Sequence, residues 1–355
     1  MNSKETRQAA KQTTHERDGW KCVVCGIPGN SETLSDHHLI ERSLWASEEN
    51  DGYICANLVS LCSSCHLKAE QTLISVEELR EMAGITEIVV PEQFYPETQL
   101  TKWGDEILIG GRRLKGPLFD EESVQEVLRE GRVLGFYDNR FKYPRTFHMP
   151  FSPGALSDDK KLKDCSQFEG KEVVIFVKID GENFQVYSDG YMHARSLSKP
   201  NHPSQAWAKN YLSQRAYLIP EGWRLSCENV YAEHSIHYSN LDNYVYLFAI
   251  WNERNEVLPF DELVEWSELL DITLCPVLWR GIWDEEIVRN IYRSKYNLDD
   301  MEGWVSWTTH GFHYKDFHKN VAKYVQSGWS ENIKHGGIHW RDKPVIPNRL
   351  RERKQ

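Results

Sequence analysis

The sequence lacks both a long apolar run and an excess of positive charge. Its most apolar stretch, residues 245–251, is far shorter than the roughly 18 residues that a membrane-spanning helix needs. The start MNSKETRQAAKQ contains no apolar segment, so we expect no signal peptide, a cytoplasmic protein and no membrane partner. The 53 Asp and Glu outnumber the 42 Lys and Arg, giving a net charge of −11. This balance at first argues against a nucleic-acid partner, because phosphates attract cations.

Internal repeats and low-complexity tracts are also missing, and the composition argues against a disordered or collagenous chain. The 355 residues suffice for two or three domains, each with its own core. Strand patterns lie at 172–179, 183–190 and 244–251, and helical patterns at 4–18, 75–84, 121–130, 261–270 and 284–294. We therefore predict an α+β chain with a small module at 1–75, a connecting region at 76–141, a large domain at 142–345 and a basic tail at 346–355.

Four of the eight cysteines form two pairs of identical spacing, Cys22-x-x-Cys25 and Cys62-x-x-Cys65. In a reducing compartment, two such pairs a few tens of residues apart predict a tetrahedral structural Zn²⁺ site more readily than disulfides. The alternatives are two chance C-x-x-C motifs or a redox dithiol.

Polar motifs lie between and beside the cysteine pairs: SDHHLI at 35–40, ANLVSLC at 56–62 and SSCH at 63–66. With the cysteines, they resemble the HNH endonucleases, the zinc-stapled ββα-metal class, over roughly residues 15–70. Hydrolysis of a phosphodiester needs a base that deprotonates water and a divalent metal that stabilises the leaving oxygen.

The HNH resemblance implies a role for each motif residue. His38 would be the general base, His37 and His66 would hold the catalytic metal, and Asn57 would orient the loop that carries the base. A register shifted by one residue would make Asp36 the ligand and His37 the base. Another alternative is a non-catalytic zinc module that docks nucleic acid or a partner.

A second set of motifs spans the large domain. The strand at 172–179 runs into Lys178-x-Asp180-Gly181, followed in order by HARS at 193–196, Cys227-Glu228, Phe248 in an apolar strand, Glu302-Gly303 and Lys323. The set resembles the covalent nucleotidyltransferase superfamily, and within it the phage-type ATP-dependent RNA ligases, over roughly residues 90–345. This resemblance implies a large domain with antiparallel sheets. The segments KYPRTFHMP (142–150), ENVYAEHSIHY (228–238) and IHW (338–340) favour the RNA-ligase branch, and the connecting region would then include the N-terminal segment of the ligase.

By this resemblance, Lys178 would attack the α-phosphate of ATP and form lysyl-AMP. Arg195 and Lys323 would bind phosphates, Glu228 the ribose, Phe248 the adenine and Glu302 a Mg²⁺ or Mn²⁺ ion, with Asp180 as a further cofactor-binding residue. An amine is nucleophilic only when neutral, so we expect desolvation, neighbouring cations or a metal to lower the pKa of Lys178. Val325 replaces a second basic residue that ligases often carry, and Lys319 or Lys315 is a candidate substitute.

The sequence thus predicts an RNA ligase that joins 3′-OH and 5′-phosphate ends, with an endonuclease module, in RNA repair or processing. Its partners would be nicked or single-stranded RNA ends, and also DNA for the first module. The alternatives are an ATP-dependent DNA ligase or a capping-type transferase, and a nucleotide-binding protein without chemistry. The acidic total does not exclude these partners, because net charge governs the far field and not a local groove.

Overall fold

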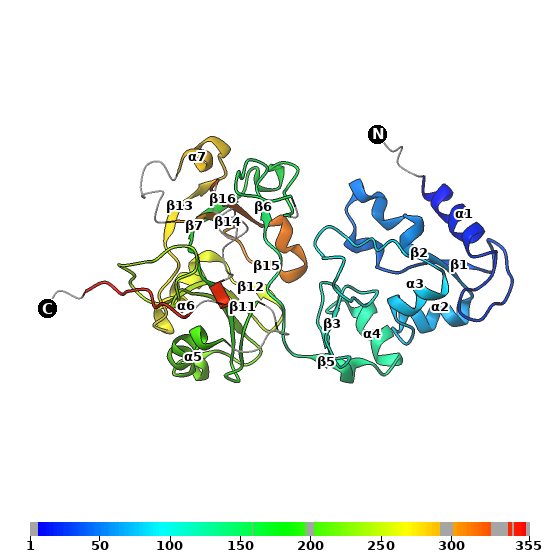
Figure 1. Ribbon diagram of the computed structural model, residues 1–355, viewed down its shortest axis with the longest axis horizontal. Coiled ribbons are helices and arrows are strands. Elements are labelled where there is room, and N and C mark those ends of the chain that lie inside the picture. The colour runs from blue at the N-terminus through cyan, green and yellow to red at the C-terminus, as the bar shows by residue number, and fades with distance from the viewer. Residues whose placement is uncertain are drawn as a thin grey trace. The chain divides into compact units, whose positions relative to one another are not determined.

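The computed structural model describes residues 6–157, 159–195, 197, 202–291, 301–327, 340–342 and 344–352 (Figure 1). Ser196 of the HARS motif, the first two residues of IHW and the last three residues of the predicted tail lie outside this part. The chain divides into two compact units, with the boundary between Phe141 and Lys142. Within the described residues, no helix combines the length and the apolar composition needed to cross a membrane.

The first unit is made of short elements. In chain order they are α1 (Arg7–Arg17), β1 (Ser35–His38), β2 (Leu58–Leu61), α2 (Ser63–Glu70), α3 (Val76–Met82), β3 (Glu106–Ile107), β4 (Arg113–Leu114), α4 (Glu122–Glu130) and β5 (Tyr137–Asp138). β1 and β2 pair antiparallel with Ser35 opposite Leu61 and His38 opposite Leu58. α2 follows β2 directly, so these three elements form the predicted ββα arrangement.

The helix predicted at 75–84 begins and ends as its sequence indicates. The Ser75 hydroxyl accepts a hydrogen bond from the Glu78 N–H, and the Glu78 carboxylate accepts one from the Ser75 N–H, which is a capping box. Gly84 follows the helix with φ of +64°, a conformation that favours glycine.

Residues 76–141 are folded and belong to the first unit. β3, β4 and β5 form a small sheet in which β3 and β4 are antiparallel and β4 and β5 are parallel. α4 buries Val124 and Leu128, four residues apart on one face. These two side chains pack with Trp103, Phe119 and Val133 in a core of their own. The region predicted as a connection is therefore a folded part of the first unit.

The second unit contains two larger sheets. Their strands are β6 (Phe147–His148), β7 (Glu172–Lys178), β8 (Glu182–Tyr187), β9 (Met192–Ala194), β10 (Arg224–Asn229), β11 (Val245–Trp251), β12 (Glu256–Val257), β13 (Val277–Ile282), β14 (Gly303–Thr308), β15 (Phe312–His313) and β16 (Val321–Val325). The helices are α5 (Ala206–Ser213), α6 (Phe260–Leu269) and α7 (Glu285–Asn290). The last residues of the helical pattern predicted at 284–294 lie outside the described part.

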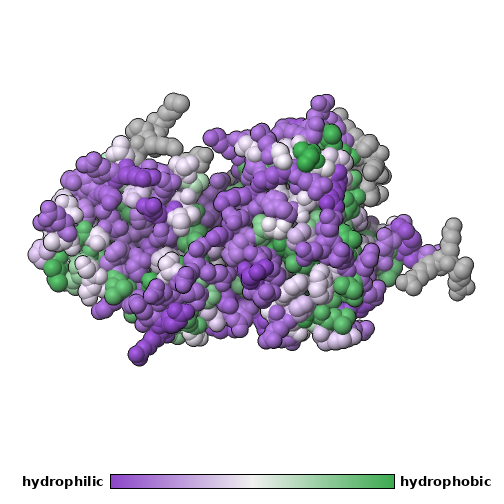
Figure 2. Space-filling view, turned by 180° about the vertical axis from the view of Figure 1, so that it is seen from behind, coloured by the Kyte–Doolittle hydropathy of each residue, from purple (hydrophilic) through white to green (hydrophobic). Residues whose placement is uncertain are grey.

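One sheet has the strand order β13-β7-β14-β16-β6, and the other has β15-β12-β11-β10-β8-β9. All of their pairings are antiparallel except β6 with β16, so the predicted antiparallel sheets are present with one parallel edge. Both sheets contribute to one hydrophobic core, and β7 is buried on both faces from Val173 to Val177. The face of the molecule in Figure 2 is largely hydrophilic, with apolar side chains in small separate groups.

Trp251 is the centre of an aromatic cluster in the second unit. Its side chain is 1% exposed, and its ring contacts those of Phe312, Tyr314 and Phe317. We predict that Trp251→Ala lowers the free energy of unfolding by about 3–5 kcal/mol, because a large cavity replaces the ring. Urea denaturation followed by circular dichroism measures this loss.

The matched control is Tyr217→Ala, because Tyr217 is 77% exposed. This substitution is expected to change the free energy of unfolding by less than about 0.5 kcal/mol. Equal losses in the two variants would contradict the assignment of Trp251 to the core.

Candidate active sites

The four predicted cysteine ligands come together in the first unit. Cys22 and Cys25 lie in the turn before β1, Cys62 is the N-cap of α2, and Cys65 lies in its first turn. Their sulfur atoms lie within 4.8 Å of one another, and Cys25 Sγ is 3.7 Å from Cys62 Sγ. Burial opposes ionisation of Cys22, but backbone N–H donors lower the pKa of its thiol to about 7. Four convergent thiols, one of them easily ionised, fit a tetrahedral structural Zn²⁺ ion.

A second group of candidate metal ligands lies between β1 and α2. His37 Nδ1 is 3.3 Å from Glu70 Oε1, and His66 Nε2 is 3.0 Å from the same oxygen. The three ligand atoms lie within 4.8 Å of one another, and the two imidazole rings are nearly perpendicular. Two imidazoles and a carboxylate fit a divalent transition-metal ion such as Mn²⁺ better than Mg²⁺, which prefers oxygen ligands.

Glu70 was not among the residues predicted from the sequence. The signal that could have found it is its position four residues after His66, which places both side chains on one face of α2, a helix that was not predicted. The structure also decides which residue of the Asp36-His37-His38 run lies in this group. The Asp36 carboxylate contacts Lys11 at 2.9 Å and His15 at 3.1 Å, and does not belong to the group.

Burial and nearby charges favour the protonation states in which His37 and Glu70 can bind a metal. Burial lowers the pKa of His37 to about 4, and the positive charge of Lys102 acts in the same direction. Burial opposes ionisation of Glu70, but hydrogen bonds with His37 and His66, aided by Lys102, hold the pKa of this carboxyl well below its usual range. At neutral pH His37 is therefore a neutral imidazole and Glu70 a carboxylate, as metal binding requires.

His38 points to the other face of β1, because successive residues of a strand alternate. Its ring packs edge-on against Tyr53 with 4.8 Å between centroids. Burial, again with Lys102, lowers the pKa of His38 to about 4, so the ring is neutral at pH 7. No described residue hydrogen-bonds the buried Nε2 atom, which is thus a candidate proton acceptor.

Asn57 is fully buried and fixes the chain just after His38. Its Nδ2 donates to the carbonyls of Ile40 and Gly52 at 3.1 and 3.0 Å, and its Oδ1 accepts from the Ile40 N–H at 3.0 Å. The amide thereby holds the loop that leaves β1 against the segment that leads into β2. This geometry suits the predicted orienting role of Asn57.

In the second unit, Lys178 and Glu302 form an ion pair with 2.5 Å between Nζ and Oε2. The strand register explains the pair, because Lys178 is the last residue of β7 and stands opposite Gly303, the first residue of β14. Glu228 comes from β10 in the other sheet. Its charge raises the pKa of Lys178, and the charge of Lys178 in turn opposes the rise in the pKa of Glu228.

The ionisation of Lys178 differs from the prediction. Burial acts to lower the pKa of its ammonium, but the negative charges of Glu302 and Glu228 outweigh burial and raise it. Burial raises the pKa of Glu228 to about 8. The nucleophile therefore needs these carboxylates to be neutralised or to accept its proton before it can react.

Lys323 stands opposite Val305 in the pairing of β14 with β16, so β14 lies between the strand of Lys323 and β7. Burial lowers the pKa of Lys323 to about 8, and repulsion by Lys178 adds to the effect. Arg195, just after β9, also repels Lys323. The two predicted phosphate-binding cations and the predicted nucleophile thus share one electrostatic environment.

The remaining predicted ligase residues lie around this group. Half-buried Phe248 packs edge-on against Tyr143 at 5.6 Å, and the charges of Glu228 and Arg195 both act on the pKa of the Tyr143 phenol. Asp180 accepts a hydrogen bond from the Ser235 N–H at 2.7 Å, and its own N–H donates to Tyr238 Oη at 2.9 Å. Asp180 therefore anchors the loop that follows Glu228.

Sequence reasoning missed Tyr143 and Tyr238 as neighbours of the ligase residues. Both occur in segments quoted as typical of RNA ligases, but a tyrosine there carries no local signal for its contacts. Each is positioned by an aromatic or hydrogen-bonding contact across a long sequence separation.

Comparison with solved structures finds RNA ligases. A variant of Naegleria gruberi RNA ligase with ATP and Mn is 17% identical with a TM-score of 0.36, and the match covers 48% of this chain and 54% of that one. An archaeal ATP-dependent RNA ligase is 14% identical with a TM-score of 0.33, and the match covers 47% of this chain and 45% of that one. The chain thus spans about half the length of these ligases. The search of curated proteins finds no match.

Two family models match the sequence, one in each compact unit. The model described as HNH endonuclease matches residues 22–72, which include the four cysteines and the group of His37, His66 and Glu70. The model described as RNA ligase matches residues 171–325, from Lys178 through Glu302 to Lys323. This chain therefore combines an HNH endonuclease domain with an RNA ligase domain.

Proposed function

We propose that the protein is an ATP-dependent RNA ligase that joins 3′-OH and 5′-phosphate ends through a lysyl-AMP intermediate. Its HNH domain would be a metal-dependent endonuclease, and the two activities would serve RNA repair or processing. The observation that carries the ligase proposal is the convergence of Lys178, Glu302, Glu228 and Lys323 within the RNA ligase domain. The ATP and Mn in the Naegleria gruberi ligase structure support the choice of cofactors.

In the first step, Lys178 Nζ would attack the α-phosphorus of ATP, forming the N–P bond as the bond to pyrophosphate breaks. The ammonium must first lose a proton, and the candidate acceptors are the carboxylates of Glu302, 2.5 Å away, and of Glu228, whose charge acts on the ammonium. A divalent ion held by Glu302 would supply neutralisation of phosphate charge. Arg195 and Lys323 would hold the phosphates by their positive charge.

The other residues would position the nucleoside. Glu228 would accept hydrogen bonds from the ribose, and Phe248 with its neighbour Tyr143 offers aromatic surface to adenine. Asp180 would keep the loop after Glu228 in place. The AMP would then pass from Lys178 to an RNA 5′-phosphate, and an RNA 3′-OH would displace it.

In the HNH domain, His38 Nε2 would take a proton from the attacking water, and Asn57 would hold the loop behind it. His37, His66 and Glu70 would bind the divalent ion that stabilises the leaving oxygen. The four cysteines would bind a structural Zn²⁺ ion. RNA and DNA are both candidate substrates of this domain.

We predict that Lys178→Ala abolishes labelling of the protein by α-labelled ATP, because the substitution removes the proposed nucleophilic amine. Denaturing electrophoresis of the labelled protein measures this covalent step. The matched control is Lys161→Ala, which removes an exposed lysine of the same unit and should leave labelling unchanged. Labelling of Lys178→Ala at the wild-type level would contradict the assignment, and competition with GTP would define the base preference.

The pKa of Lys323 predicts a pH dependence of nucleotide binding. Its ammonium is charged below about pH 8 and neutral above, so phosphate affinity should fall as the pH rises through 8. At one pH unit above this pKa we expect about a tenfold loss, since about one tenth of the side chain stays charged. Titration with a non-cleavable ATP analogue at a series of pH values measures the loss.

The control for this titration is Lys323→Arg. A guanidinium stays charged over the whole range, so the variant should lose the fall in affinity above pH 8. If wild type and Lys323→Arg show the same pH dependence, Lys323 is not the cation that binds the phosphates.

We predict that His38→Ala lowers metal-dependent cleavage of RNA or DNA by about 10²–10⁴-fold, the usual contribution of a general base. Gel assays with Mn²⁺ and with EDTA measure the rate. His310→Ala removes an exposed histidine of the other unit and should cleave as the wild type does. Unchanged cleavage by His38→Ala would favour the alternative of a non-catalytic zinc module.

A further inference from the structure

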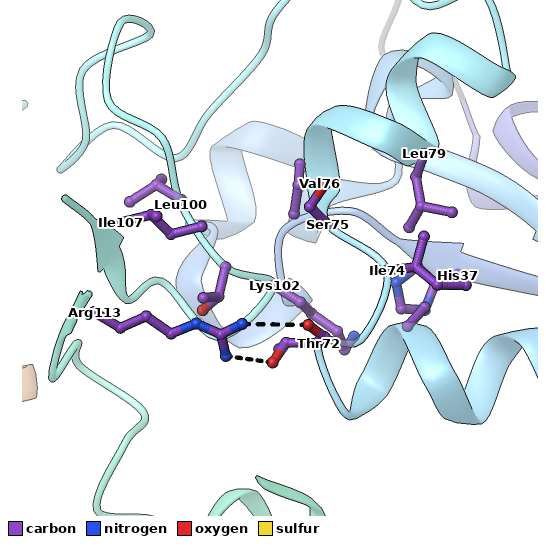
Figure 3. A pocket seen from close by; sticks show the side chains of 12 residues that line it. His37, Thr72, Ile74, Ser75, Val76, Leu79, Leu100, Lys102, Ile107 and Arg113 are labelled. Atoms are coloured by element: carbon purple, nitrogen blue, oxygen red, sulfur yellow. Dashed lines mark hydrogen bonds between the residues drawn. The ribbon is translucent and has the colours of Figure 1, made fainter. Parts of the chain in front are cut away.

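Lys102 brings a positive charge into the candidate metal group of the HNH domain. It lies outside the segment that the HNH family model matches, in the stretch predicted as a connection. Its Nζ is 2.6 Å from Glu41 Oε2 and 3.2 Å from Glu70 Oε1, and its side chain is only 5% exposed. Glu70 Oε1 is also the oxygen that His37 and His66 contact. Figure 3 shows Lys102 and His37 among the side chains that line one pocket.

Hydrogen bonds hold the turn that carries Lys102 in place. The Lys102 carbonyl accepts a hydrogen bond from the Glu41 N–H at 2.8 Å, which ties the turn to the end of β1. Thr101 donates to the buried carboxylate of Asp105 at 2.7 Å. Trp103 Nε1 donates to the Glu70 carbonyl at 2.9 Å. The ammonium is therefore held at the metal group by contacts on both sides of it.

A close approach explains the glycine of this turn. Gly104 has φ of +81°, and a Cβ there would lie 2.8 Å from a methyl carbon of Leu44 and 3.0 Å from the ring of Phe94. Only glycine allows the turn to pack this tightly against the HNH domain. The position of Lys102 is thus fixed by the backbone and not by its own side chain alone.

The charge of this group sets how strongly it can hold a divalent ion. Two carboxylates and one ammonium carry a single net negative charge, and imidazoles add none when they bind a metal, because they do so in the neutral form. A divalent ion beside the ammonium is repelled by it and leaves the group with a net positive charge. The single negative charge of a phosphodiester would balance that excess.

We propose that Lys102 is a tethered cation that keeps the divalent-metal affinity of the HNH site low until a phosphodiester binds. Metal and nucleic acid would then bind cooperatively, because the binding of each lowers the electrostatic cost of binding the other. Lys102 is a positioning residue in this scheme and touches the carboxylate ligand, not the metal. The proposal rests on the nuclease function proposed above.

A purely structural role is the competing explanation. The ion pair with Glu41 alone would suffice to hold the turn against β1. However, the same ammonium also reaches the ligand oxygen of Glu70, which a structural pair does not need. The two explanations differ in what they predict for metal binding, because a structural role leaves the affinity of a folded variant unchanged.

The test measures Mn²⁺ binding by electron paramagnetic resonance on the full chain with its zinc. All proteins carry His38→Ala so that nucleic acid is not cut, and a protein that also carries His37→Ala gives the background from other Mn²⁺ sites. Titrations are done alone and with a short single-stranded RNA or DNA oligonucleotide. We expect the oligonucleotide to tighten Mn²⁺ binding at the HNH site.

Lys102→Met should tighten Mn²⁺ binding without oligonucleotide by at least about tenfold and weaken the effect of the oligonucleotide, because the repulsion is gone. Lys102→Arg keeps the charge and should stay close to the wild-type affinity. Circular dichroism checks that each variant is folded. Unchanged or weaker Mn²⁺ binding by folded Lys102→Met would overturn the proposal.

Glu41→Gln gives an independent test with the opposite sign. It removes one negative charge and leaves Glu70 as the only carboxylate partner of Lys102 in the group, so Mn²⁺ binding should weaken. Tighter or unchanged binding in this variant would also overturn the proposal, even if Lys102→Met does not fold. If His37→Ala removes no Mn²⁺ site at all, the metal site of the proposed nuclease fails instead, which is a separate outcome.

Discussion

An ammonium paired with carboxylates recurs at both candidate sites. Lys178 pairs with Glu302 and is also affected by the charge of Glu228, and Lys102 contacts both Glu41 and Glu70. A buried charge is costly unless it is paired, so removal of either lysine or of its partners would disturb the surrounding charges. The same pairing keeps each site ready for phosphates and metal ions, because a carboxylate that holds an ammonium can instead hold a metal cation. Both candidate sites therefore depend on whether an ammonium or a metal ion balances the negative charge of their carboxylates.

Strand register places these groups, and it does so differently in the two units. In the ligase domain the end of β7 faces the start of β14, so the proposed nucleophile and an acid that are 124 residues apart become neighbours. In the HNH domain the alternation along β1 separates two adjacent histidines. His37 faces the acidic side chain of α2, while His38 faces Tyr53. One short strand thus presents a candidate metal ligand on one face and a candidate proton acceptor on the other.

The site residues that could be predicted from the sequence are those that form a motif within a short stretch of the chain. The C-x-x-C pairs, the His37-His38 run and the lysine at the end of a strand are all visible in short windows. Lys102 has no such signal, because its partner Glu41 is 61 residues away and no motif surrounds it. The ionisation of Lys178 was also beyond sequence reasoning. Its pKa depends on which charges the two sheets bring nearest, and these are acids and not the expected cations.

The acidic composition of the chain follows from the same arrangement. Carboxylates such as Glu302 and Glu70 would repel a phosphate unless a cation lies between them. A nucleic-acid site of this kind would bind phosphates through bridging cations, either lysines already in place or bound metal ions, and would need no broad basic surface. Specificity for a polynucleotide end then resides in a few buried groups, where screening by salt is weaker than at the surface. A net charge of −11 is therefore compatible with the two proposed nucleic-acid sites. It keeps non-specific attraction to duplexes low, and it does not prevent a few lysines from carrying positive charge within each site.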